Sequence, residues 1–309
     1  MTSKIMMGTD PEFFMRRLED NKLISAVPFI AGGKHDPIKL EKSGGTLQHD
    51  NVAVEFSTVP ANSPQTFVDI LRATLQETIS KLPPGHELLA SASAVFDDNQ
   101  LNTPEAQEFG CTPDYDAWEV KENDSPTHPN AKFRSCGGHL HIGCLDMEGK
   151  LTHEDAKFLL TFEGKLDMVK GMDLFLGIIS TVLDSSPEAV ERKKLYGRAG
   201  CHRGTLYGVE YRALSNFWTK SPMLSMLMTS LSEDVVEVII NEKLEALIEE
   251  VGAEDIQRII NTGAVKDAEK IIENVLTAYL SEDSKFYLEE CLIKLDKTDT
   301  IEKEWSIGA

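Results

Sequence analysis

The chain has 309 residues, of which 41% are hydrophobic and 27% are charged, and its formal net charge is −20 at pH 7. This negative charge repels nucleic-acid phosphates and no Lys/Arg-rich run offsets it, so we expect no binding to a nucleic-acid backbone. No apolar run reaches the length of about 18 residues that crosses a bilayer, and no signal-peptide pattern is seen. We therefore expect a cytoplasmic protein that binds no membrane.

The cysteines show no CxxC pair and are odd in number, which argues against a disulfide framework and against a cysteine-rich zinc site. We expect them to be reduced. They are Cys111, Cys136, Cys144, Cys201 and Cys291.

The first third of the chain is predicted to be mainly extended, with one helix. Ser63-Pro64 supplies an N-cap and a first-turn proline, apolar residues then recur at helical spacing, and Pro83-Pro84 ends the element. Strands are expected over residues 5–16, 22–30, 51–58 and 87–96, where apolar runs are bounded by Gly and Pro.

The rest of the chain is predicted to change from mixed structure to helices. Residues 97–132 are polar, aperiodic and longer than most connections, so we expect a lid or substrate loop there. Thr152 is expected to cap a helix that runs to about residue 170, and Ser186-Pro187 to open another that ends at Gly197. The remaining expectations are strands over 139–143 and 209–217, a buried helix or strand over 174–183, and amphipathic helices over 223–251 and 254–280.

Acidic side chains occur inside strands that are otherwise apolar. Alternate residues of a strand face the same side, so Asp10 and Glu12 are predicted to point into one space. Glu55 lies within a hydrophobic strand, with Asp50 at its entry. One acidic pair alone is usually a solvated sheet face, but buried carboxylates must pair or bind a metal.

Two further polar pairs follow the same spacing. His139 and His141 share a face in the segment GGHLHIG, and Glu210 shares a face with Arg212 in GVEYR. Carboxylate oxygens favour magnesium or manganese, and a neutral imidazole can join them. Zinc remains open through the two histidines, although the excess of carboxylates disfavours it. We predict a metal site built from these residues.

A loop before the last pair carries Arg198 and Arg203, whose guanidinium groups match phosphate oxygens. No P-loop motif and no GxGxxG fingerprint is present. Any nucleotide is therefore expected to be held by metals and arginines.

Four motifs in order, GTDPEFF, HDNVAVEFST, SCGGHLHIG and GVEYRALSNFW, resemble the active-site strands of the phage-type COOH-NH2 ligases, also called type 2 amidoligases. They span residues 8–218. The resemblance implies an α+β fold, with a curved antiparallel sheet like the half-barrel of glutamine synthetase and glutamate-cysteine ligase, backed by helices. It implies a catalytic domain over 1–220, and the helical pattern that follows predicts a C-terminal helical subdomain over 221–309.

The resemblance also implies roles for individual residues. His141 would lie toward the ATP phosphates, Arg198 and Arg203 would contact the phosphates or an acyl-phosphate, and Arg212 would contact phosphate or substrate. The implied metal ligands are Asp10, Glu12, Asp50, Glu55, His139 and Glu210.

The implied activity is an ATP- and Mg²⁺-dependent ligase, with Mn²⁺ as an alternative metal, that forms an amide through an acyl-phosphate. Its substrates would be small-molecule or peptide carboxylates and amines, and its location would be the host cytoplasm if the chain is phage-encoded. Asp114 and Asp116 are candidates for the general base on position alone. A guanidino kinase-like phosphotransferase and a non-catalytic metal-binding structural protein stay open as alternatives, as does the oligomeric state.

Overall fold

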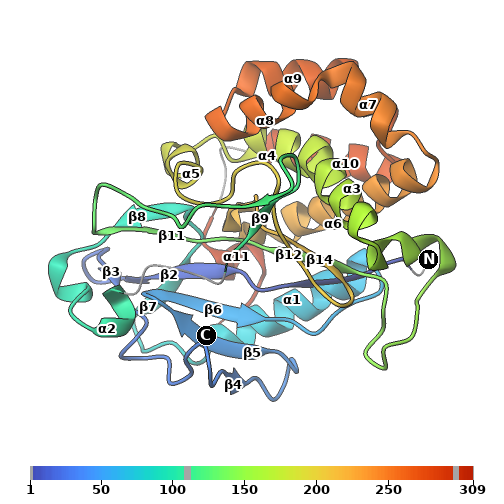
Figure 1. Ribbon diagram of the computed structural model, residues 1–309. Coiled ribbons are helices and arrows are strands. Elements are labelled where there is room, and N and C mark those ends of the chain that lie inside the picture. The colour runs from blue at the N-terminus through green and yellow to red at the C-terminus, as the bar shows by residue number, and fades with distance from the viewer. Residues whose placement is uncertain (1–2, 108–112, 295–298, 309) are drawn as a thin grey trace.

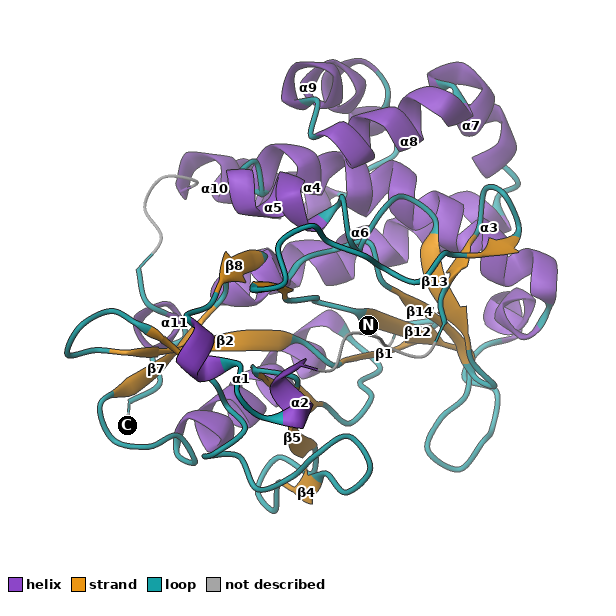
Figure 2. Cartoon of the chain, turned by 60° about the vertical axis from the view of Figure 1, so that its left-hand side comes forward, coloured by secondary structure: helices purple, strands orange, loops and turns teal. Residues whose placement is uncertain are grey.

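The strands form two six-stranded antiparallel sheets, with a layer of helices against them (Figures 1 and 2). The computed structural model describes residues 3–107, 113–294 and 299–308. The expected α+β fold, a curled antiparallel half-barrel backed by helices, is confirmed.

The first sheet brings together strands from the first, third and fourth of the four sequence motifs. β1 and β14 flank β12, and every pairing in the sheet is antiparallel. Its order is β1 (Met6–Thr9), β12 (Leu140–Gly143), β14 (Gly208–Tyr211), β13 (Cys201–Gly204), β9 (Tyr115–Asp116) and β10 (Lys121–Glu122).

The second sheet contains the strand that directly follows β1 in the chain. The strand expected over 5–16 is broken at Asp10–Pro11, because β1 pairs with β12 whereas β2 pairs with β6 and β7. Proline lacks the N–H that a continuous ladder needs. The order is β3 (Leu23–Ile24), β2 (Glu12–Arg17), β6 (Ala53–Ser57), β5 (Thr46–Asp50) and β4 (Ile38–Lys39), with β7 (His86–Leu89) also on β2; β8 (Ser93–Val95) and β11 (Phe133–Ser135) pair separately.

The helix predicted after Ser63 is confirmed as α1 (Pro64–Ile79). The Ser63 hydroxyl oxygen accepts a hydrogen bond from the Thr66 N–H, which satisfies one of the unpaired donors of the first turn. The apolar face of α1 is buried, and α1 packs against α6 (Pro222–Ile240). Buried residues of this face include Phe67, Val68, Leu71 and Leu75.

The capping prediction for Thr152 is wrong. The Thr152 hydroxyl donates to the Lys4 carbonyl oxygen, and Thr161 caps α3 (Phe162–Met172) instead. A 3₁₀ segment at Glu154–Leu160 fills the interval. The apolar run that follows is helical, first as a π-helical turn at Asp173–Gly177 and then as α4 (Ile178–Leu183).

Two other predicted elements are shorter than expected. α5 (Pro187–Arg192) starts at Ser186 as predicted but ends well before Gly197. The strand expected over 209–217 ends at Tyr211, and a 3₁₀ segment occupies Asn216–Lys220.

The described part of the C-terminal third is helical, as predicted, and most of its helices lie above the sheets in Figure 1, whereas the last one lies beside β2. The helix expected over 223–251 is divided near Glu242, which has a positive φ of 55°. None of the described helices combines the length and apolar character that crossing a bilayer requires. After α6 come α7 (Leu244–Val251), α8 (Ala253–Thr262), α9 (Val265–Asn274), α10 (Glu282–Lys294) and α11 (Ile301–Glu304).

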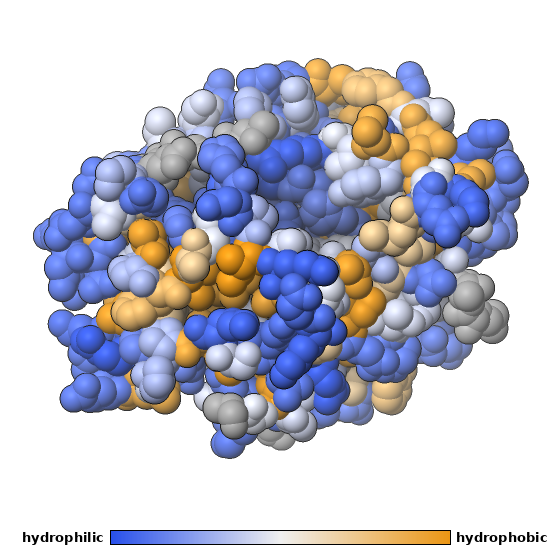
Figure 3. Space-filling view, turned by 90° about the horizontal axis from the view of Figure 1, so that it is seen from below, coloured by the Kyte–Doolittle hydropathy of each residue, from blue (hydrophilic) through white to orange (hydrophobic). Residues whose placement is uncertain are grey.

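The segment predicted as a lid contains short elements. They are a 3₁₀ turn at Asp98–Gln100, α2 (Pro104–Gln107), β9 and β10. Cys111 lies outside the described residues, and the four described cysteines are free and buried. Most of the face seen in Figure 3 is hydrophilic, with apolar residues in smaller groups.

Candidate functional site

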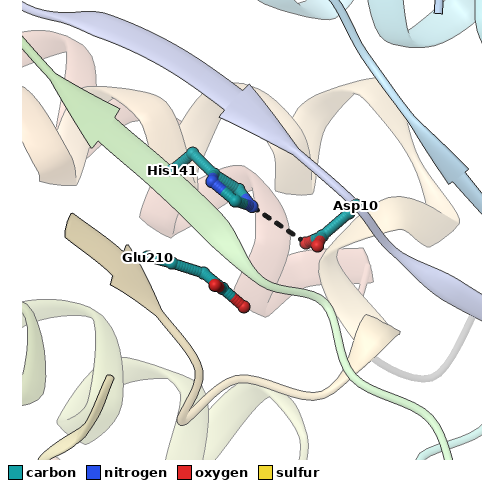
Figure 4. Close-up of side chains that lie close together, drawn as sticks. All are labelled: Asp10, His141 and Glu210. Atoms are coloured by element: carbon teal, nitrogen blue, oxygen red, sulfur yellow. Dashed lines mark ion pairs between the residues drawn. The ribbon is translucent and has the colours of Figure 1, made fainter. Parts of the chain in front are cut away.

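Three potential metal ligands, Asp10, His141 and Glu210, meet in the first sheet (Figure 4). One ligand atom from each lies within 4.8 Å of the others. The Asp10 Oδ1 is 3.2 Å from the His141 Nε2 and 3.3 Å from the His139 Nδ1. We call these four residues the histidine group.

The pairing of three strands brings the histidine group together. His141 on β12 lies opposite Gly8 on β1 and opposite Glu210 on β14. Directly opposed residues of antiparallel strands have neighbouring side chains. Asp10 follows the end of β1 and points toward His141 from the other side.

Attraction within the histidine group outweighs the effect of burial on the pKa values of Asp10 and His141, but not on that of His139. Burial alone would raise the pKa of Asp10, but the charges of His141 and His139 hold that pKa well below its usual range. Burial would lower the pKa of His141, and the Asp10 charge raises it. For His139, burial and then the nearby Arg212 charge lower the pKa, so its imidazole is neutral near pH 7. A neutral imidazole can offer a lone pair to a metal.

Three carboxylates, those of Glu12, Asp50 and Glu55, form a second cluster, which we call the carboxylate group. Glu12 on β2 faces Glu55 on β6, and Asp50 ends β5. Burial and then the Asp50 charge raise the pKa of Glu12 to about 8. Burial and then the Asp10 charge raise the pKa of Glu55 well above its usual value. Glu12 and Asp50 line the same cleft as His139 of the histidine group, so the two groups are neighbours.

Both groups fit a divalent cation. The Gly137 N–H donates to Glu12 at 2.6 Å and the Gln48 amide donates to Glu55 at 2.7 Å, and both donors are neutral. No described lysine or arginine forms an ion pair with the carboxylate group. In the histidine group, the buried Asp10 Oδ1 accepts no well-aligned hydrogen bond. Ligand sets this rich in oxygen suit Mg²⁺ or Mn²⁺.

The predicted pairing of Asp10 with Glu12 is therefore only partly correct. The break at Pro11 sends Asp10 to the histidine group and Glu12 to the carboxylate group. The other predicted metal ligands, His139 among them, reach one group or the other.

Two of the three predicted arginines reach the histidine group. Arg212 is buried and forms an ion pair with Glu210, and its Nε lies 3.4 Å from the Asp114 Oδ2. The Arg203 Nη1 is 3.6 Å from the Glu210 Oε1. Arg198 is exposed, and its Nε donates at 3.3 Å to the carbonyl oxygen of Lys193, the residue just after α5.

Sequence reasoning missed two buried arginines beside the carboxylate group. Arg192 on α5 is 2% exposed and donates to the carbonyl oxygens of Ala213 and Arg212. Arg134 on β11 is 5% exposed and donates to the Asn51 Oδ1 at 2.7 Å. An arginine in a short polar helix resembles a surface residue, so nothing in the sequence was a reason to select Arg192. The only feature that could have indicated Arg134 was its position just before the glycine-histidine motif.

Residues that follow β14 contact the backbone just before β12, the strand that carries His141. The Trp218 indole N–H donates to the Gly138 carbonyl oxygen at 3.0 Å, and the Asn216 amide donates to the Glu12 carbonyl oxygen at 2.7 Å. A Cβ on Gly138 would lie 2.4 Å from the Ser215 carbonyl oxygen. Only glycine therefore fits at this position without displacing the backbone.

Two clefts open on the two groups. The cleft beside His141, here called the histidine-side cleft, has a volume of about 430 Å³ and is lined by Met6, Gly8, Thr9, Asp10, Ser57, Thr58, Pro60, His141, Gly143, Leu145, Asp146, Met147 and Tyr207. The cleft beside Glu12, here called the carboxylate-side cleft, has a volume of about 90 Å³ and is lined by Glu12, Asp50, Asn51, Asp114, Arg134, Ser135, Gly137, His139, Arg192, Leu195, Tyr196, Gly197 and Arg212.

No protein-family model and no curated protein matches the chain. Among solved structures, it is similar to a bifunctional glutathione synthetase from Pasteurella multocida, with 12% identity, 94% of this chain and 52% of that chain covered, and a TM-score of 0.42. It thus spans about half the length of that enzyme. A novel glutamine synthase homolog (13% identity, 94% and 70% covered, TM-score 0.36) and ligand-free GmaS (11%, 92% and 72%, 0.37) are also similar. Similarity at this level does not define the chemistry of the site.

Proposed function

We propose that this chain is an ATP- and Mg²⁺-dependent ligase that joins a carboxylate to an amine, as type 2 amidoligases do. One observation carries the proposal: two neighbouring groups of metal ligands lie between two clefts. Each cleft is lined by residues of one group or of both. Such an arrangement suits two reactants that approach a shared set of cations from different sides.

Each of the two groups would bind one divalent cation. The carboxylate group would hold one Mg²⁺. Asp10 and Glu210 would hold another with His139, whose Nδ1 lies 3.3 Å and 3.6 Å from their carboxylate oxygens, and Mn²⁺ could replace either ion. Bound Mg²⁺ supplies positive charge that offsets the charge of phosphate oxygens. Arg203 and Arg212 lie next to Glu210, where their guanidinium groups can bind the transferred phosphoryl group.

The nucleotide fits the histidine-side cleft. Pro60, Met147 and Tyr207 give it apolar walls suited to a base, and Asp10 and His141 line the same cleft. The Tyr207 hydroxyl lies 2.6 Å from the His141 Nδ1, which fixes the ring at the boundary between the base and the phosphates. The carboxylate substrate then occupies the opposite cleft, near the buried cations of Arg192 and Arg212.

The reaction would have two steps. A carboxylate oxygen of the substrate attacks the γ-phosphorus of ATP, the bond from that phosphorus to the bridging oxygen breaks, and ADP leaves. The amine nitrogen then attacks the acyl carbon, the C–O bond to phosphate breaks, and the amine loses a proton. The products are ADP, inorganic phosphate and an amide. Asp114, which lines the carboxylate-side cleft, remains a candidate for the base.

Product analysis tests this function directly. The purified chain is incubated with ATP, Mg²⁺ and mixed carboxylates and amines, and ADP, phosphate and new masses are measured. The expected result is equal release of ADP and phosphate with an amide product. Glu12→Gln and Glu210→Gln should abolish it, whereas Glu77→Gln, a buried glutamate that binds the backbone of residues 42–43, should not.

The alternatives give different results. A phosphorylated product without free phosphate would favour a phosphotransferase. Metal binding without any binding of ATP would favour a structural metal site, and both outcomes would overturn the ligase proposal.

A further inference from the structure

Asp173 is a fully buried carboxylate that belongs to neither group of metal ligands. It is the first residue of the π-helical turn between α3 and α4. An isolated charge is costly to bury, so a carboxylate in this position needs hydrogen-bond donors or a cation. Among the described residues no cation pairs with it, and its partners are neutral donors.

Three hydrogen bonds reach Asp173 from three separate segments. The Trp118 indole N–H donates to the Oδ2 at 2.7 Å, and the Gly200 N–H donates to the same oxygen at 2.6 Å. The Tyr211 hydroxyl donates to the Oδ1 at 2.7 Å. One side chain therefore ties the distant segment of Trp118 to the start of β13 and to the end of β14.

Each of these stretches carries part of the candidate site. Tyr211 is the last residue of β14 and lies between Glu210 and Arg212 in the chain. The loop of Gly200 leads into β13, which carries Arg203. Trp118 follows Asp114, whose carboxylate lies 3.4 Å from the Arg212 Nε.

The segment that contains Asp116 and Trp118 also packs closely against the loop that contains Gly200, so one cannot shift without the other. Gly200 has a positive φ of 81°, and a Cβ there would lie 2.6 Å from the Asp116 Oδ1 and 2.9 Å from the Trp118 Cδ1. The Gly200 carbonyl oxygen accepts from the Ala117 N–H at 3.0 Å. The Asp116 Oδ1 in turn accepts from the Trp118 N–H at 2.7 Å. Loss of the Asp173 carboxylate would leave the buried Gly200 N–H and the half-buried Trp118 indole N–H without their acceptor.

We propose that Asp173 is a positioning residue that fixes the segments bearing Arg203, Arg212 and Asp114 from behind the sheet. This inference rests on the proposed function, since it assigns these arginines to phosphoryl transfer. A displacement of about 1 Å in a group that contacts reacting atoms costs up to about a hundredfold in rate. Asp173 touches no reacting atom, so it acts only through the placement of the other residues.

The test compares Asp173→Ala and Asp173→Asn with Asp234→Ala. Asp234 is a matched control because it is also buried, at 5% exposure, and accepts from the Ser281 N–H in the helical region. Amide hydrogen exchange is measured in all three variants. Asp173→Ala should speed exchange in segments 113–119, 198–204 and 208–212 together, and Asp234→Ala should leave these segments as in the wild type.

Kinetics provides the second measurement. Asp173→Ala should lower kcat by about ten- to a hundredfold, with a smaller change in the KM for the amine. Asp173→Asn, which retains one acceptor oxygen, should recover part of kcat. Unchanged exchange in the three segments would overturn the proposal, as would a kcat equal to that of Asp234→Ala. A wild-type chain without turnover would overturn the proposed function instead, and the exchange data would still decide whether Asp173 holds the segments.

Discussion

At the scale of single residues, the face-to-face placement of Glu12 and Glu55 is the clearest mark of a binding role. Like charges directly opposite each other on antiparallel strands are destabilising. Asp50 adds a third carboxylate to the same space. A protein without a cation to place here would gain stability from replacing one of them, so the cluster is better explained by a ligand than by the fold.

Glu55→Gln tests this explanation. Without metal, the variant should be at least as stable as the wild type, because it removes repulsion and keeps the hydrogen bond from Gln48. Added Mg²⁺ at about a hundred times its Kd should stabilise the wild type by about 2.7 kcal/mol, and the variant by much less. Thermal unfolding with and without Mg²⁺ measures both effects. An equal gain in the two proteins would contradict the assignment.

Asp173 should make stability depend on pH. Burial raises its pKa to about 7 in the folded protein, against an ordinary value of 3.8. Between these values the folded chain keeps a proton that the unfolded chain has released, so the free energy of unfolding falls as pH rises, and it levels off above pH 7. Asp173→Asn lacks this dependence. Relative to the variant, the wild type should lose on the order of 1 kcal/mol or more between pH 4 and pH 8 in urea denaturation.

At the scale of elements, the site depends on the position of the backbone just before β12. Gly138 is enclosed by Ser215 and Trp218, which belong to the segment after β14. The end of the fourth sequence motif therefore supports the third motif just before β12. Asn216, in the same segment, donates to the carbonyl oxygen of Glu12 and so also supports the start of β2.

Gly138→Ala should displace this junction. The added Cβ would contact the Ser215 carbonyl oxygen and the Trp218 indole nitrogen at 2.4 and 2.6 Å, so the backbone before His139 must move. We expect a loss of about 1–3 kcal/mol in the free energy of unfolding. Turnover should fall further than stability accounts for. Gly308→Ala, where nothing lies within 4 Å of the new Cβ, serves as the control in denaturation and kinetic assays.

How much the sequence predicted varies with the kind of element. The Ser63 cap of α1 and the shared faces of His139 with His141 and of Glu210 with Arg212 were predictable, because caps and strand alternation are local rules. The separation of Asp10 from Glu12 was not, since it depends on which strands each one pairs with. Arg192 was equally hidden, because its partners are backbone carbonyls that only the folded chain brings to it.

At the scale of the whole molecule, the two clefts should divide the kinetic effects of substitutions. Tyr207 lines only the histidine-side cleft, and Tyr196 lines the carboxylate-side cleft. Tyr207→Ala should raise the KM for ATP by about tenfold and leave the KM for the carboxylate substrate nearly unchanged. Tyr196→Ala should do the opposite. Steady-state kinetics with each substrate varied in turn would reveal a shared cleft if both variants raised the same KM.

The Asn216 hydrogen bond to the Glu12 carbonyl oxygen joins residues that are 204 positions apart. Contacts so distant in sequence form slowly, because a long loop of chain must close before they can be made. During synthesis, the complete site can therefore form only after the segment that follows β14 has emerged from the ribosome. Metal or nucleotide binding would then report the completion of folding, and shorter fragments should bind neither.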